Sequence, residues 1–129
     1  MVRTAYAAIS ERDSNALAKV TDADMVLDFS RSIGPEKGVY RGREGIARYA
    51  AANEEAFESF ELSPIEFVVG PRRHIVARHR IRAKARATGI EWDRVPDVAL
   101  VWELRNGKVI KATLYQGRSE ALAAVGLQE

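Results

Sequence analysis

The sequence predicts a single α+β domain spanning residues 1–129, in which helices come first and an antiparallel sheet follows. The first half of the chain carries apolar residues at helical spacing, whereas the second half alternates apolar and polar residues between Gly, Pro and Asn-Gly breaks. A chain of 129 residues can bury a core without disulfides or metal. This order of elements places the helices on one face of the sheet. We expect that sheet to be strongly curved, because a few helices must cover its concave side.

Two short helices begin the chain. Tyr6 and Ile9 lie at helical spacing within residues 3–11, and Asp13 is placed to cap a second helix with the sequence SNALAKV. The apolar face of that second helix consists of Ala16, Leu17 and Val20. A strand over residues 24–30 and a turn-rich loop over residues 31–40 then lead to the longest helix.

The longest helix is predicted over residues 43–57. One face of it carries Ile46, Tyr49, Ala50, Asn53 and Phe57. The preceding stretch YRGREGIARY, at residues 40–49, allows two interpretations: a phosphate-binding loop, or a glycine-lined entry into the helix. A phosphate loop needs a preceding strand and a following Lys-Ser/Thr pair, and we identify neither here. We therefore interpret Gly42 and Gly45 as the helix entry, where glycine permits tight backbone and close packing.

Strands are predicted for the four runs FELSPIEFVVG, HIVARHRIRAKARATG, VPDVALVWELRNG and KVIKATLYQG. Asn106-Gly107 is a strong signal for a two-residue hairpin turn between the last two runs. Trp92, in TGIEWDRVP, is expected in a loop over an opening. The sequence SEALAAVGL is expected to form a final short helix.

Composition excludes several classes of protein. The chain has no cysteine, and its 20 basic residues face 18 acidic ones, a balance that does not suggest a nucleic-acid partner. No apolar run reaches membrane-spanning length, and the N-terminus turns charged too soon for a signal peptide, so we expect a cytoplasmic protein. The two histidines, His74 and His79, point to opposite faces of one strand, and no metal site is predicted.

Four stretches carry a resemblance to a known family: AYAAISERDSNAL, YRGREGIARY, VWELRNGKVIKATLYQ and SEALAAVGL. In their order and spacing the chain resembles the SnoaL-like branch of the nuclear transport factor 2-like superfamily, which includes ketosteroid isomerase, scytalone dehydratase and limonene epoxide hydrolase. The resemblance implies a cone: a strongly curved, mixed or antiparallel sheet wrapped around N-terminal helices and one long helix. It also implies an open end, no cofactor, and a homodimer through the outer sheet face.

Alternation along residues 74–89 predicts a cavity. Its inward residues are Ile75, Ala77, His79, Ile81, Ala83, Ala85 and Ala87. The three consecutive alanines would leave space for a ligand, unless larger residues such as Tyr49 and Phe57 fill it. His79 is either a catalytic group on the cavity wall or a neutral core histidine.

Asp28 is the second catalytic candidate. It shares parity with Val26, so we expect it to point inward at the end of its strand. By resemblance it matches the catalytic carboxylate of ketosteroid isomerase, which implies a general acid or base. The alternative is a carboxylate that caps the following loop. The isomerase's other functional residues are not matched: its second acid falls near Leu100, and its oxyanion-hole tyrosine falls one residue from Tyr6. We identify no equivalent of the Asp-Arg-Asp set of limonene epoxide hydrolase.

Six further residues are predicted to bind substrate: Tyr6, Tyr49, Asn53, Trp92, Trp102 and Gln116. Asn53 either hydrogen-bonds a neighbour such as Tyr49 or orients the ligand. Gln116 shares an inward parity with Ile110, Ala112 and Leu114 and is expected near the mouth.

The outward face of the same strand is basic, and it carries Arg78, Arg80, Arg82, Lys84 and Arg86. Asp97 and Glu103 are the expected ion-pair partners. A dimer interface is the leading interpretation of this face, with nucleic-acid binding as the alternative.

Together, these features predict a cofactor-independent isomerase, dehydratase or cyclase for a small apolar molecule. The alternative is a non-catalytic ligand-binding or dimeric accessory module.

Overall fold

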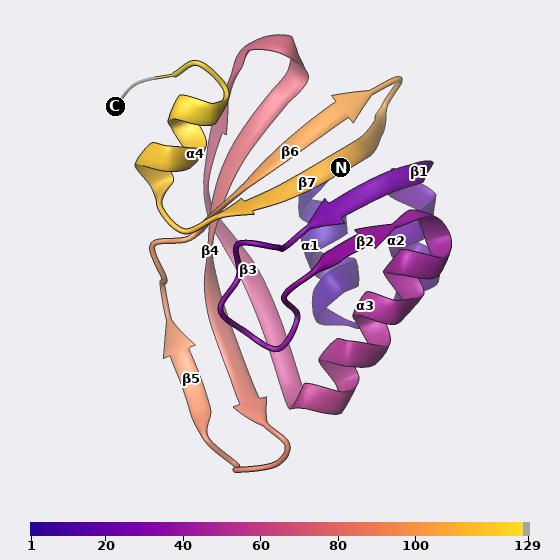
Figure 1. Cartoon of the computed structure of the whole chain (residues 1–129), viewed down its shortest axis with the longest axis vertical. Helices are drawn as coiled ribbons and strands as arrows, with labels where there is room; N and C mark the ends of the chain where they lie inside the picture. The colour runs from indigo at the N-terminus through magenta and orange to yellow at the C-terminus, as the bar shows by residue number, and fades with distance from the viewer. Residues whose placement is uncertain (128–129) are drawn as a thin grey trace.

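The computed structural model describes residues 1–127 and shows a curved seven-stranded sheet with helices against its concave face (Figure 1). The helices are α1 (Val2–Ser10), α2 (Ser14–Val20), α3 (Gly42–Ala56) and α4 (Arg118–Ala124), and a 3-10 turn, η1, occupies Pro71–Arg73. The strands are β1 (Thr21–Asp28), β2 (Val39–Arg41), β3 (Phe57–Val69), β4 (His74–Ala85), β5 (Glu91–Arg94), β6 (Ala99–Arg105) and β7 (Lys108–Tyr115). The predicted α+β class and curved sheet are confirmed.

The strands follow the order β2-β1-β7-β6-β4-β3, and β5 pairs with β4. The β1–β7 pair is parallel and the other pairs are antiparallel, so the sheet is mixed. Since β2 and β3 are the two ends of this order, the sheet does not close into a barrel. Its concave side faces α1, α2 and α3 (Figure 1).

Local signals in the sequence place several of these boundaries. The Asp13 carboxylate accepts a hydrogen bond from the Ala16 backbone N–H at 3.0 Å and caps α2, as predicted. Arg12 has a φ of 55° and breaks α1 from α2. Asn106 and Gly107 have φ values of 52° and 74°, the two positive values that a tight hairpin turn requires.

The GREGI stretch enters α3 directly from β2. Gly42 has a φ of 65°, which few residues other than glycine adopt without strain. A Cβ on Gly45 would lie 2.7 Å from the carbonyl carbon of Tyr40, so only glycine fits where α3 crosses β2. This geometry agrees with a helix entry. The short strand β2 was missed in the sequence, but no Lys-Ser/Thr pair follows it.

Four expectations differ from the structure. Strand β1 begins at Thr21, before the predicted residue 24, and β2 begins within the predicted loop. Trp92 lies in β5 and not in a loop, because residues of β5 pair with β4. Helix α4 packs on the opposite face of the sheet from the other helices, where Ala121 and Leu122 bury a second apolar cluster. Its partners from the sheet are Val76, Ala99 and Val101.

The main core lies between the concave face and α1, α2 and α3, and it includes Tyr6, Leu27 and Trp102. Within residues 1–127, no helix has the length and apolar character needed to cross a membrane.

Candidate ligand site inside the cone

His79 is buried on the concave face of β4, with 5% of its surface exposed. The predicted alternation along β4 is confirmed, because Ala77 and Ala83 are buried on this face while Arg80 and Arg82 are exposed on the other. Within the described residues, the Nδ1 atom of His79 has no hydrogen-bond partner. A buried polar atom without a partner is costly, so this nitrogen marks a point where an additional polar atom would bind favourably.

Tyr6 from α1 lies beside this histidine, and Trp102 from β6 lies beside Tyr6. The Tyr6 ring centroid is 5.9 Å from that of His79 and 5.2 Å from that of Trp102. The Trp102 indole N–H donates to the Tyr6 hydroxyl at 3.4 Å, and both side chains are buried. Burial raises the pKa of Tyr6, against the smaller effect of the Trp102 hydrogen bond, so the hydroxyl stays neutral. The three residues form a cluster of uncharged polar groups in an apolar interior.

Burial also determines the charge of His79. Burial and, to a smaller degree, the neighbouring Arg78 cation together lower the pKa of His79 to about 4. The imidazole is therefore neutral near pH 7. A neutral imidazole has one nitrogen that donates and one that accepts, so it can hydrogen-bond a hydroxyl or a carbonyl group.

The space predicted beside the inward alanines is filled by aromatic rings. Ala83 stands in register between Phe60 of β3 and Trp92 of β5. The ring centroid of Phe57 lies 5.2 Å from that of Phe60 and 6.1 Å from that of Trp92. The second interpretation of these alanines, in which larger residues such as Phe57 occupy the room, therefore describes this end of the cone. Ala87 lies beyond the end of β4.

A cavity of about 10 Å³ lies between α1, α2 and α3, with Arg12, Tyr49 and Asn53 in its wall. Space of this size holds about one water molecule. It is too small for an organic ligand.

Tyr49 and Asn53 are held by neighbours. The Asn53 side-chain oxygen accepts from Arg12 Nε at 2.9 Å, and Asn53 also hydrogen-bonds Tyr49. Arg12 Nη2 donates to the backbone oxygen of Phe57 at 2.6 Å. Burial raises the pKa of Tyr49. The predicted alternative for Asn53, a hydrogen bond to Tyr49, is present, and Arg12 is a partner that the sequence did not reveal.

Asp28 does not point into the cone, and the inward prediction is wrong. Residues Leu27 and Phe29 are buried in the main core, so the alternation of the strand places Asp28 on the other face. Its carboxylate accepts from the Ser30 hydroxyl at 2.6 Å and the Ser30 N–H at 3.1 Å, and Arg31 lies 3.9 Å away. The Ser30 hydroxyl bond is the main cause that lowers the pKa of Asp28. Asp28 thus caps the following loop.

Gln116 is exposed and donates its side-chain amide to the Arg31 backbone oxygen at 2.6 Å. The inward parity predicted for Ile110 is wrong, because a register shift between Glu103 and Leu104 turns Val109 into the core instead. After this shift the predicted alternation resumes with Ala112.

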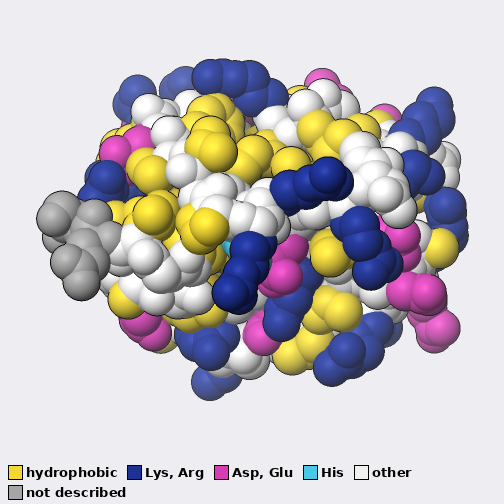
Figure 2. Space-filling model, turned by 90° about the horizontal axis from the view of Figure 1, so that it is seen from above, with side chains coloured by type: hydrophobic (Ala, Val, Ile, Leu, Met, Phe, Trp, Pro, Cys, Tyr) yellow, Lys and Arg dark blue, Asp and Glu magenta, His cyan; other side chains and the backbone are white. Residues whose placement is uncertain are grey.

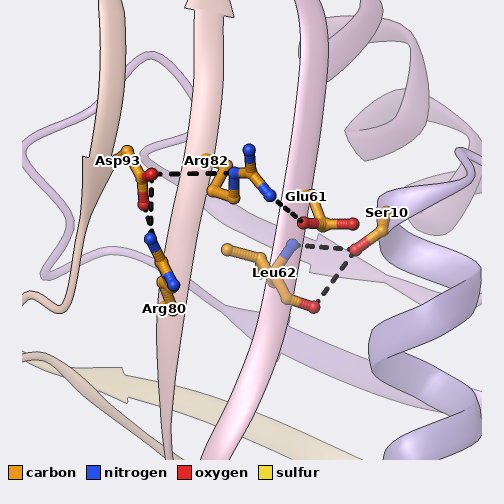
Figure 3. A network of polar contacts seen from close by, with 6 residues as sticks. All are labelled: Ser10, Glu61, Leu62, Arg80, Arg82 and Asp93. Carbon is orange, nitrogen blue, oxygen red and sulfur yellow. Dashed lines mark hydrogen bonds and ion pairs between the residues drawn. The ribbon is translucent and has the colours of Figure 1, made fainter.

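Within residues 1–127, Arg80, Arg82 and Lys84 on the basic outer face of β4 form ion pairs, although not with the expected acids. Arg80 forms two hydrogen bonds with Asp93 of β5, at 2.6 and 2.9 Å, and Arg82 lies between Asp93 and Glu61 (Figure 3). Lys84 pairs with Glu58, whereas Glu103 lies beside His74. The predicted role of Asp97 and Glu103 as ion-pair partners of the basic residues is therefore wrong. Acids on β3 and β5 lie in register with β4, whereas β6 pairs only with its first residues.

A curved, open sheet around three helices, with neutral polar groups buried against its concave face, defines a small α+β cone protein. The sequence profile of the SnoaL-like domain matches residues 2–112. The chain therefore belongs to the SnoaL-like domain family. No curated protein sequence matches the chain.

Solved structures share the fold. A protein of ketosteroid isomerase-like fold from Catenulispora acidiphila, in complex with trimethylamine, is 18% identical with a TM-score of 0.75, covering 98% of this chain and 92% of that chain. An NTF2-like protein from Burkholderia pseudomallei is 20% identical with a TM-score of 0.73, covering 97% and 94%. TerC, co-crystallised with polyporic acid, is 18% identical with a TM-score of 0.73, covering 96% and 93%. The chain therefore shares its fold with these ketosteroid isomerase-like and NTF2-like proteins.

Proposed function

We propose that this protein binds a small, largely apolar organic molecule inside the cone, with His79 as its polar contact. The observation that carries the proposal is the buried Nδ1 atom of His79, which has no partner in the described part of the chain. The surrounding wall consists of apolar and aromatic side chains, which suits an uncharged ligand with a single hydroxyl or carbonyl group. Relatives solved with trimethylamine and polyporic acid support small-molecule binding in cones of this kind.

The ligand would enter between Phe57, Phe60 and Trp92. These rings cover Ala83, which lies four residues from His79 along β4, or about 13 Å. Strand β5 has four residues and, among the described strands, pairs with β4 alone, which makes it the element of this end that could move. Movement of Trp92 with β5 would vacate part of the space that the aromatic rings fill beside Ala83.

Of the two residues predicted to act as acid or base, Asp28 and His79, only His79 could act at this site. A neutral imidazole in an apolar interior can accept a proton from a bound molecule. Asp28 faces away from the interior and would contribute only through the loop it caps.

A pair of probes of nearly equal size tests the hydrogen bond. We expect 1-naphthol to bind more tightly than 1-methylnaphthalene, because only the naphthol can pair with the unpartnered nitrogen. The preference should be roughly three- to tenfold, the effect of one neutral hydrogen bond, and His79→Phe should abolish it. Titrations monitored by tryptophan fluorescence provide the measurement, since Trp102 lies beside Tyr6 and Trp92 lies beside Phe57 at the proposed entrance.

Two control variants separate the alternatives. His74→Phe changes the other histidine, and Asp28→Asn removes the outward carboxylate; both should keep the preference for naphthol. The proposed site would be refuted if neither probe binds, or if the preference for naphthol survives in His79→Phe. If Asp28→Asn loses the preference, Asp28 contributes to ligand binding.

We also propose a homodimer through the outer face of β3, β4 and β5. The paired charges of Arg80, Arg82, Asp93 and Glu61 support this, because they form a network across three neighbouring strands that a second copy could extend (Figure 3).

A further inference from the structure

An open groove of about 610 Å³ lies outside the cone. It runs between α2, the start of α3 and the turn that joins β6 to β7. Its lining residues are Asn15, Ala18, Lys19, Arg43 and Lys108. The groove is therefore built from polar and basic side chains, with a single small apolar residue.

Three cations converge there without acidic partners. Lys19, Arg43 and Lys108 are exposed, and none of them forms an ion pair within residues 1–127. No acidic residue is among the residues that line the groove. This contrasts with the outer face of β4, where Arg80 is matched by an acid. Like charges held together repel, and an anion bound between them relieves that repulsion.

The tertiary structure brings these cations together from distant parts of the chain. Thr21, directly after α2, pairs with Val109 of β7, which places the helix carrying Lys19 beside Lys108. The positive φ of Gly42 turns the chain into α3, so Arg43 begins that helix at the same end. Lys and Arg side chains are prominent on the face that carries the β6–β7 turn, as Figure 2 shows.

We propose that this groove binds a small, multiply charged anion that carries phosphate groups. Two ammonium groups and one guanidinium group supply charged donors suited to phosphate oxygens, and the Asn15 amide adds a neutral donor. An apolar molecule would gain little from a lining with one alanine. The groove is separate from the cone interior, so its ligand is distinct from the molecule proposed to bind at His79.

Calorimetric titration with sodium tripolyphosphate at low ionic strength tests the groove. The test variant combines Lys19→Gln, Arg43→Gln and Lys108→Gln. The matched control combines Lys37→Gln, Arg72→Gln and Arg94→Gln, which removes the same net charge from exposed positions elsewhere. We expect the groove variant to bind at least about tenfold more weakly than the unchanged protein, the combined effect of three exposed charge pairs. The control should stay within about twofold.

Both variants should keep the melting temperature and the naphthol preference of the unchanged protein, so a failure of the cone site is distinguishable from a failure of this groove. Equal weakening in the two variants would show that only net charge matters and would overturn the proposal. No measurable binding of tripolyphosphate would overturn it as well. If tripolyphosphate does not bind but a single-stranded oligonucleotide binds through these three residues, the groove is a nucleic-acid site and the proposal is overturned.

Discussion

His79 shows how one side chain links the sequence to a function. Its position in an otherwise apolar alternation identifies it as an inward residue, and the structure adds that Nδ1 has no partner and that burial lowers its pKa to about 4. The sequence offers the same signal for β1, where Met25, Leu27 and Phe29 form a more apolar set than Val26 and Asp28. The larger apolar set is the one that packs inside.

Acid should destabilise the protein through His79. The folded pKa of about 4 lies below the ordinary value of 6.5, so between these values the unfolded chain binds a proton that the folded chain does not. The free energy of unfolding should therefore fall as the pH drops from 6.5 to 4, by up to about 3 kcal/mol from this group.

Urea unfolding at several pH values measures this contribution. His79→Gln should flatten the decline over that window, whereas His74→Gln, which retains the buried histidine, should leave most of it in place. An unchanged decline in His79→Gln would show that other groups cause the acid sensitivity.

The entry into α3 shows why one element needs glycine at a defined place. Helix α3 crosses β2 so closely that the backbone of Tyr40 leaves no room for a Cβ on Gly45. The rings of Tyr40, Tyr49 and Phe29 then pack edge to face, with centroids 5.3 to 6.4 Å apart. The close approach thus fixes an aromatic cluster of the main core.

Gly45→Ala should destabilise the protein by about 1–3 kcal/mol, because the added methyl group must push backbone apart in a packed region. Thermal or denaturant unfolding measures the change. Gly70→Ala is the matched control, since a Cβ there would meet its nearest atoms at 3.4 Å, an ordinary contact. A stability equal to the control would mean that α3 shifts away from β2 at no cost.

The two faces of the whole molecule differ in chemistry. The concave face is apolar and covers a buried histidine, whereas the outer face of β3, β4 and β5 carries ion pairs between neighbouring strands. Exposed ion pairs add little stability to a single chain.

If the outer face forms the dimer, reversing its charge should separate the copies. We expect the variant with Arg80→Glu and Arg82→Glu to sediment as a monomer in analytical ultracentrifugation, because it would place like charges beside Asp93 and Glu61. Arg41→Glu with Arg43→Glu, on β2 and α3, changes charge by the same amount away from this face and should leave the dimer intact. A dimer that persists in the first variant, or an unchanged protein that is monomeric, would contradict the proposed interface.

Features that depend on neighbouring residues could be predicted from the sequence: the α+β class, the Asp13 cap, the Asn106-Gly107 turn and the alternation along β4. Which side chains fill the cone depends on contacts between distant elements. The register shift that turns Val109 inward arises from pairing between strands. The ring packing over Ala83 joins residues from three strands, and the Arg12 bond to Asn53 joins a turn to a distant helix. Such contacts depend on how elements far apart in the chain meet, and local residue patterns do not specify that.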